Sequence, residues 1–219
     1  GSPAYKVVQS ETKILGNDKN GIDFCLEDAY YGDTSFHIPF IAWYQVMNAS
    51  LALMTMEVLR EQIPVTMDQM QAGIARTRWQ GRMETILPGV IVDGAHNEDG
   101  VRRFVETAER FQKEYPVTLL FSAVSDKDYR DMIHTICSRI NFRKVVTTEV
   151  GGYREVPSKE LADIFSGEGC KEVGNSDSIE DAFHMACDAK GEDGMLFCVG
   201  SLYLVGEIKA LLLKEKKAQ

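Results

Sequence analysis

From residue 83 onward, short apolar runs alternate regularly with apolar stripes at helical spacing. The runs predict strands at residues 83–86, 90–92, 117–121, 144–148, 171–173 and 195–198. The stripes predict helices at about residues 98–113, 127–140, 158–165 and 179–190, and a last helix that follows residue 201. Ser158 is expected to cap the helix that runs to about residue 165. Repeated strand–helix units indicate a mostly parallel sheet with helices on both faces, so the expected fold class is α/β and Rossmann-like.

The first part of the chain has a different pattern. Short alternating runs at residues 6–8, 13–15, 22–26 and 35–38 are separated by Gly and Asn/Asp turns, which predicts a β-rich start. Residues 42–60 predict a helix that is apolar nearly all round and hence largely buried, and Thr66 caps a second helix at residues 67–75. Residues 76–82 are polar and contain a glycine, as linkers do. We therefore place a domain boundary near Arg78, between a small α+β segment at residues 1–77 and the Rossmann-like domain at residues 78–219.

Composition and net charge limit the classes of function that the protein can have. The 219 residues carry a net charge of −9, which disfavours a nucleic-acid partner, and no apolar run has the length of a membrane span. Five dispersed cysteines without a C-x-x-C pair favour reduced, mostly buried thiols and a cytoplasmic location. Residues 1–2 have the form of a cloning scar before strand-like sequence, so we expect a piece of a longer protein, in monomeric form and without a signal peptide.

The corner at residues 91–100 is the first candidate site. Asp93 ends a strand and His96 lies in the turn before a helix that Asn97 caps, at the carboxyl end of the sheet, where such folds bind ligands. The acidic pair Glu98 and Asp99 would repel a pyrophosphate at this helix start. A carboxylate at Asp93 accepts hydrogen bonds, so it favours a hydroxyl, an amine or a metal as the bound group. The alternative is that Asp93 and His96 only cap the turn.

Other polar residues have equally open roles. Lys127 lies in SDKD at a helix start, where a cation opposes the helix dipole, so it either holds an anion or is a plain surface lysine. Ser201 follows a glycine and either takes part in binding a carboxylate or caps its helix. Gln45 and Asn48 share one helix face and bond either to neighbouring backbone or to the edge of a base.

The sequence lacks the motifs of several classes of enzyme. A serine hydrolase is disfavoured because no G-x-S-x-G elbow is present. A histidine zinc site is disfavoured because no H-x-x-x-H pair occurs, and we expect no metal site in this chain. A phosphate loop of the form G-x-x-x-x-G-K-[ST] is also missing from the sequence.

Four motifs in order resemble one family. They are WQGRME from residue 79, VDGAHN from residue 92, DKD from residue 126 and GSLYLVGE from residue 200. Together they resemble the C-terminal part of the folylpolyglutamate and dihydrofolate synthases of the Mur ligase superfamily. Upstream, YQVMNA from residue 44 resembles the end of the family's central ATPase domain, with Tyr44 where the family often has His.

The resemblance implies an ATP-dependent ligase. Such enzymes phosphorylate the terminal carboxylate of a folate or dihydropteroate, and the amine of L-glutamate then attacks the acyl phosphate. It implies that Gln45 and Asn48 lie against adenine, that Arg82 reaches the phosphates and that Asp93 bonds the ribose. It also implies that His96, Lys127 and Ser201 help to hold glutamate or the nucleotide.

The chain lacks the phosphate loop and the evident lysine and magnesium carboxylates that phosphoryl transfer needs. We therefore expect a fragment whose catalytic residues and main Mg²⁺ ligands lie in a missing N-terminal ATPase domain, and which does not act alone. Two alternatives stay open: another Mur-type amide ligase, and a non-catalytic nucleotide-binding module. The DKD and GSLYLVGE motifs favour the folate branch.

Overall fold

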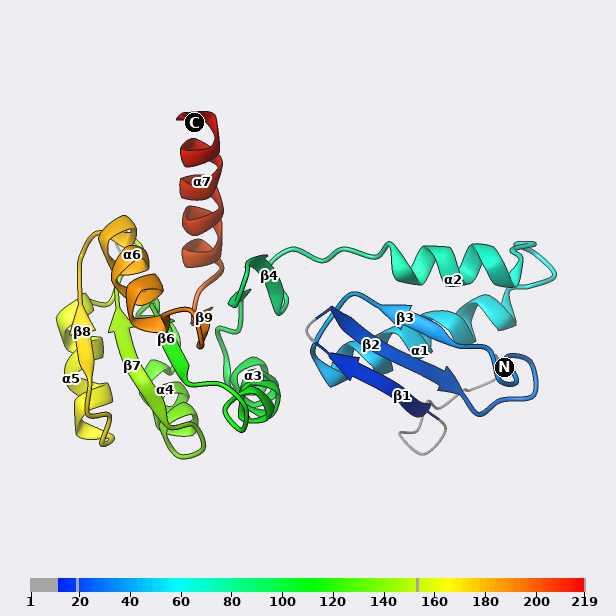
Figure 1. Cartoon of the computed structure of the whole chain (residues 1–219), viewed down its shortest axis with the longest axis horizontal. Helices are drawn as coiled ribbons and strands as arrows, with labels where there is room; N and C mark the ends of the chain where they lie inside the picture. The colour runs from blue at the N-terminus through cyan, green and yellow to red at the C-terminus, as the bar shows by residue number, and fades with distance from the viewer. Residues whose placement is uncertain (1–11, 19, 153, 219) are drawn as a thin grey trace. The chain divides into compact units, whose positions relative to one another are not determined.

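The computed structural model describes residues 12–18, 20–152 and 154–218 of the chain. The chain divides into two compact units, Gly1–Trp79 and Gln80–Gln219, shown in Figure 1. The expected strand at residues 6–8 and the expected scar at residues 1–2 lie outside the described residues. No helix among the described residues is long and apolar enough to cross a membrane.

The first unit is a three-stranded antiparallel sheet with two helices, as an α+β segment should be. Its strands lie in the order β1-β2-β3, and Ile22, Phe24, Phe36 and Leu53 are among its buried core side chains. The elements are β1 (Thr12–Asp18), β2 (Gly21–Leu26), β3 (Phe36–Ile38), α1 (Trp43–Val58) and α2 (Met67–Ala75).

The expectation that the first helix is largely buried is wrong. In α1 only one stripe is buried, namely Gln45, Val46, Ala49, Ser50 and Leu53. Leu51 and Val58 on the same helix are 56% and 43% exposed. The helix is apolar on more than one face, but the sheet of the first unit covers only the stripe that faces it, so apolar composition overstated the burial.

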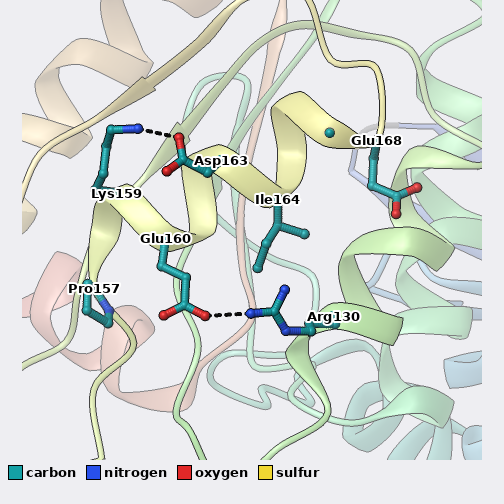
Figure 2. Close-up of a pocket in the computed structure, with 8 residues that line it drawn as sticks. Arg130, Pro157, Lys159, Glu160, Asp163, Ile164 and Glu168 are labelled. Carbon is teal, nitrogen blue, oxygen red and sulfur yellow. Dashed lines mark hydrogen bonds and ion pairs between the residues drawn. The ribbon is translucent and has the colours of Figure 1, made fainter.

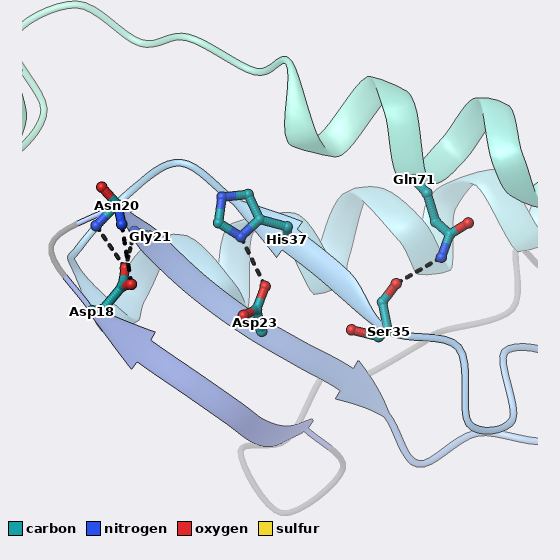
Figure 3. A network of polar contacts seen from close by, with 7 residues as sticks. All are labelled: Asp18, Asn20, Gly21, Asp23, Ser35, His37 and Gln71. Atoms are coloured by element: carbon teal, nitrogen blue, oxygen red, sulfur yellow. Dashed lines mark hydrogen bonds and ion pairs between the residues drawn. The ribbon is translucent and has the colours of Figure 1, made fainter.

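The second helix begins where its sequence predicts. Thr66 forms a capping box with Gln69, with hydrogen bonds in both directions. Gln71 of α2 donates from Nε2 to the backbone oxygen of Ser35, at 2.8 Å, which fixes the helix beside the start of β3 (Figure 3). The same figure shows His37 of β3 paired with Asp23 of β2, at 2.8 Å, on the open side of the sheet.

The second unit is built on a six-stranded sheet in the order β4-β5-β9-β6-β7-β8. Strand β4 is antiparallel to β5 in a hairpin, and the other pairs are parallel, so the expected fold class is confirmed. The strands are β4 (Glu84–Leu87), β5 (Val90–Asp93), β6 (Val117–Phe121), β7 (Phe142–Thr147), β8 (Val173–Asn175) and β9 (Met195–Val199).

Helices cover both faces of this sheet (Figure 1). Helices α6 and α7 pack with Val92, Leu120 and Cys198 in one core cluster. Helices α3, α4 and α5 follow one another along the other face, where Phe104 meets Phe197 and Phe121 meets Phe165 edge to face. The helices are α3 (Glu98–Phe111), α4 (Tyr129–Cys137), α5 (Ser158–Gly167), α6 (Ile179–Lys190) and α7 (Leu202–Ala218).

Two local expectations need correction. Ser158 does not cap α5, because Pro157 is the N-cap residue and Ser158 is already helical. The Ser158 hydroxyl instead donates to Asp177 at 2.5 Å and joins the ends of α5 and β8. The thiols are also not mostly buried, since only Cys25 and Cys198 are buried and the other three are half-buried.

Gly200 is a position where the fold requires glycine. Its φ is +108°, and a Cβ there would lie 2.1 Å from the Ser122 carbonyl oxygen. We expect Gly200→Ala to lower the free energy of unfolding by about 2–4 kcal/mol, because strain and a backbone clash add. Urea denaturation measures the change.

Gly206→Ala is the matched control, because Gly206 lies in α7 with open space around its Cβ position. It should stabilise the helix by up to about 1 kcal/mol. Equal effects of the two substitutions would contradict the close approach at Gly200.

Candidate functional site

Strand register places four loops side by side at the carboxyl edge of the parallel sheet. Asp93 and Phe121 both pair with Val199 of the strand between them, and Phe121 also pairs with Thr147. The chain leaves all four strands at this level, so the segments that follow them form one edge. We call this the loop edge, made of the described residues 94–97, 122–128, 148–152, 154–157 and 200–201. Open α/β sheets bind ligands at such an edge.

Asp93 is an anchor within this edge. Its side chain is 3% exposed, with Oδ2 accepting from the Met83 amide at 2.8 Å and Oδ1 from the Ala95 amide at 2.7 Å. Burial raises the pKa of Asp93 to about 6, while those two hydrogen bonds and the nearby Arg82 and His96 oppose the rise. Both oxygens already accept hydrogen bonds from backbone amides, so the contact with a ribose hydroxyl stays a prediction.

The segment that Asp93 holds is strained. Met83 is buried and has a φ of +45°, a left-handed conformation that a bulky side chain rarely adopts. Such a residue costs on the order of 1–3 kcal/mol, and a hydrogen bond from its amide to a carboxylate offsets a similar amount. Gly94 adds a further tie, since its amide donates to the Gly81 carbonyl at 2.7 Å. Asp93 thereby fixes the backbone on which Arg82 is carried.

His96 has one defined tautomer in this geometry. Its Nδ1 lies 2.7 Å from the Gly94 carbonyl oxygen, which can only accept, so Nδ1 carries a proton. The ring is half-buried, and Nε2 remains as its second polar atom. Asn97 next to it caps α3 by accepting from the Gly100 amide, which confirms the predicted cap.

Lys127 and Ser201 lie on the two other loops nearest this corner. Lys127 precedes Asp128, the N-cap of α4, and no described residue bonds to its ammonium group. Ser201 is 2% exposed, and its Oγ accepts from the Tyr203 amide at 3.1 Å. The observed contact of Ser201 is thus the helix-capping one, while its hydroxyl proton remains able to donate.

Arg154 connects its own loop with the loop at residues 122–128 and with the start of α7. The sequence did not predict this role. Its guanidinium bonds Asp126 at 2.8 Å and the Tyr203 hydroxyl at 3.2 Å. Its carbonyl accepts from the Ser125 amide at 2.7 Å. Arg154 was visible in the sequence as a polar residue at a strand end, but no local motif indicates its partners, which come from one other loop and from the first turn of α7.

Gln45 and Asn48 contact each other in the first unit. The Asn48 Nδ2 donates to Gln45 Oε1 at 2.8 Å. Gln45 is 4% exposed, and its Nε2 has no hydrogen-bond partner among the described residues. A buried amide donor without a partner costs about 1–3 kcal/mol, so the Nε2 of Gln45 is a candidate donor to a ligand or a bound water molecule.

One groove of the second unit lies beside α5 and reaches the loop edge only at Pro157. It has a volume of about 790 Å³, lies along α5, and is lined by charged side chains such as Arg130, Glu160 and Asp163 (Figure 2). Arg130 and Glu160 pair across it at 2.8 Å. Among the described residues no three His, Cys, Asp or Glu side chains are gathered so that they could hold a metal ion.

Comparison with known proteins gives consistent matches. Residues 81–202 match the profile of the Mur ligase, glutamate ligase domain family. The chain is 29% identical over 197 residues to the dihydrofolate synthase/folylpolyglutamate synthase of Bacillus subtilis, covering 86% of this chain and 43% of that protein. It is 27% identical to the folylpolyglutamate synthase of Lacticaseibacillus casei, covering 90% of this chain and 45% of that protein.

A solved structure agrees with these relatives. The folylpolyglutamate synthase of Mycobacterium tuberculosis, solved in complex with ADP and AMPPCP, superimposes with a TM-score of 0.73 at 25% identity. The match covers 93% of this chain and 48% of that one. The chain therefore spans somewhat less than half of the length of these relatives.

The raised pKa of Asp93 predicts that the stability of the folded protein depends on pH. The folded protein keeps a proton that the unfolded chain releases between about pH 4 and pH 6, so the stability contributed by Asp93 falls as the pH rises through this window. We expect the free energy of unfolding of the wild type, minus that of Asp93→Asn, to fall by about 2–2.5 kcal/mol from pH 4 to pH 7.

The measurement is urea denaturation of both proteins across this range. The same exchange at the exposed Asp68 is the control, and its difference from wild type should change by less than about 0.5 kcal/mol. A difference at Asp93 that stays flat or grows with pH would contradict the burial of this carboxylate.

Proposed function

The chain belongs to the Mur ligase family through its glutamate ligase domain, and we propose that it is the C-terminal part of a folylpolyglutamate synthase. In the proposed reaction, ATP phosphorylates the terminal carboxylate of a folate. The amine of L-glutamate then attacks the acyl phosphate, an amide bond forms, and phosphate leaves. Dihydropteroate is a second carboxylate substrate that the similarity to the Bacillus subtilis enzyme suggests.

The loop edge is the observation that carries the proposal. The whole chain is acidic, with a net charge of −9, yet Arg82, His96 and Lys127 lie on or next to the edge formed at the ends of β5 and β6. The nucleotide phosphates, the folate carboxylate and glutamate are all anionic. The edge also carries the acidic Asp126, Asp128, Glu149 and Glu155, so the anionic ligands are assigned to these individual basic side chains and not to the net charge of the edge.

Each candidate has a role consistent with its contacts. Arg82 is assigned to the phosphates, and Asp93 acts by fixing the backbone of Arg82 as well as through the expected ribose contact. Lys127 is assigned to a carboxylate of glutamate, because no described residue neutralises its ammonium group. His96 and Ser201 complete the polar rim, through Nε2 and the hydroxyl proton.

Adenine is assigned to the amide pair of α1. The unpartnered Nε2 of Gln45 is a donor, and the ring nitrogens of adenine are acceptors. Asn48, which is exposed, supplies a second amide on the same helix face. The catalytic groups, and the residues that hold the Mg²⁺ accompanying ATP, are assigned to the part of the enzyme that precedes this chain in its relatives.

The function is tested by incorporation of radiolabelled L-glutamate into tetrahydrofolate with ATP and Mg²⁺. We expect incorporation by the full-length protein that contains this sequence, and none by the 219 residues alone. Incorporation of another amino acid into another acid would favour a different Mur-type ligase. Nucleotide binding by the full-length protein without any transfer would favour a non-catalytic module.

Lys127→Ala tests the glutamate assignment in the full-length protein. Loss of a charged hydrogen bond is worth about 1.5–3 kcal/mol, so the KM for glutamate should rise roughly 10- to 100-fold while the KM for ATP stays within about twofold. Lys171→Ala, at an exposed lysine outside the loop edge, is the control and should change neither. An unchanged KM for glutamate would remove Lys127 from the site.

Gln45→Met tests the adenine assignment by two readouts that should move in opposite directions. Removing the unpartnered Nε2 should raise the free energy of unfolding of this chain by up to about 1 kcal/mol, because water can replace the hydrogen bond that the exposed Asn48 loses with Oε1. In the full-length protein the KM for ATP should rise about tenfold, because the base loses its donor. A lower stability together with an unchanged KM would show that the amide has a purely internal partner.

A further inference from the structure

Two half-buried cysteines lie together at one end of the layer formed by α4 and α5. Cys137 is the last residue of α4 and Cys170 follows the end of α5, and their sulfur atoms are 3.6 Å apart. A disulfide bond is about 2.05 Å long, so the two sulfur atoms need to approach by only about 1.5 Å. The three other cysteines have no such neighbour among the described residues.

Backbone geometry fixes the position of Cys170. Helix α5 ends in a Schellman motif, in which the Cys170 amide donates to the Phe165 carbonyl and the Gly169 amide to the Ser166 carbonyl, both at 3.1 Å. Gly169 supplies the left-handed residue, with a φ of +92°. Phe165 is fully buried against Phe121, so the motif is attached to the core of the sheet.

Side-chain pairs hold α4 beside α5 at both ends. His134 and Cys137 are three residues apart on one face of α4, and His134 Nδ1 contacts Glu168 Oε2 at 2.9 Å, next to the sulfur pair. At the other end of α4, Arg130 bonds Glu160 at 2.8 Å. Figure 2 shows both Glu168 and the Arg130–Glu160 pair along the groove beside α5. The sulfur atoms are thus brought together by contacts that do not depend on a disulfide.

We propose that Cys137 and Cys170 form a reversible disulfide by exchange with a low-molecular-weight disulfide such as oxidised glutathione. One cysteine thiolate attacks a sulfur of the small disulfide, forms a mixed disulfide and releases one small thiol. The second cysteine thiolate attacks the mixed disulfide and releases the other small thiol. The two cysteines are oxidised, the small disulfide is reduced, and the two protons lost by the cysteines end on the two released thiols.

Cys170 is the attacking cysteine. Either thiol can donate in the contact between the two sulfur atoms. With Cys137 as the donor, the contact lowers the pKa of Cys170 and raises the pKa of Cys137, and partial burial opposes the first change and adds to the second. The thiolate is the nucleophile in exchange, so the cysteine with the lowered pKa reacts first. Cys137 then acts as the resolving thiol.

The bond would enclose β7, the loop that carries Arg154, and α5. Cross-linking two residues that are 33 positions apart restricts the unfolded chain, which stabilises the folded unit. The sites of glutamate and nucleotide proposed above do not enter this argument, so the redox proposal stands independently of the proposed function.

Equilibration of this chain with oxidised glutathione, followed by trypsin and mass spectrometry without reduction, tests the proposal. We expect a linked pair of the peptides at residues 131–139 and 160–171 that disappears on treatment with dithiothreitol. The Tm should rise by about 5–10 °C in the oxidised protein. Cys137→Ser and Cys170→Ser should each abolish the linked peptide and the Tm shift, and Cys187→Ser, at another half-buried cysteine, should abolish neither.

The single variants also separate the two roles. Cys137→Ser keeps a hydroxyl that can donate to Cys170, so it should accumulate a glutathione adduct on Cys170 faster than Cys170→Ser accumulates one on Cys137. Free thiols at both positions after equilibration in excess oxidised glutathione would overturn the proposal, as would linkage of either cysteine to a different partner. Equal adduct rates with the linked peptide present would overturn only the assignment of Cys170 as the attacking residue.

Discussion

The buried carboxylate of Asp93 is the interaction on which the second unit depends. It ends the first parallel strand, and it binds the two backbone segments that reach it from opposite sides, at Met83 and at Ala95. Without an acceptor at this point the left-handed Met83 would have no compensation for its strain, and the start of β4 would be free to move. The corner that carries His96 and the segment that carries Arg82 are therefore parts of one rigid element.

The burial of Asp93 also bears on which charged side chains lie near it. A carboxylate that is almost wholly buried needs nearby positive potential, and Arg82 and His96 supply part of it. The edge is thus arranged first for the stability of its own backbone. Basic groups that are held in place in this way are also preorganised for an anionic ligand, because their position is not set by the ligand.

Much of the fold could be read from the sequence, because the second unit is locally consistent. Asn97 and Thr66 cap helices where expected, and strand–helix alternation gave the parallel sheet. The burial of α1 was misjudged because composition shows that a side chain is apolar but not whether anything covers it. Ser158 was misjudged because Pro157 supplies the helix start and Asp177, far along the chain, engages the hydroxyl.

The places of the candidate residues in the fold were predictable from the sequence, but the hydrogen bonds that connect them were not. Asp93, His96, Lys127 and Ser201 follow from the rule that ligands bind at the carboxyl ends of parallel strands. That Asp93 bonds the Met83 amide, or that Arg154 joins two loops and the start of α7, depends on the order of strands in the sheet. No local pattern encodes that order, since β9 lies between β5 and β6 although it is the last strand in the sequence.

The central position of β9 has a consequence for how the second unit folds. Strands β5 and β6 do not pair with each other, and the edges that they turn toward the middle of the sheet pair only with β9. Val90, for example, pairs with Leu196, which is synthesised about a hundred residues later. Ribosomal synthesis delivers β9 after every other strand of the sheet. Pairings between such distant residues close large loops and fold slowly. The nascent unit therefore keeps two unpaired inner strand edges until its final segment inserts, and in that interval it is most exposed to aggregation and most dependent on chaperones.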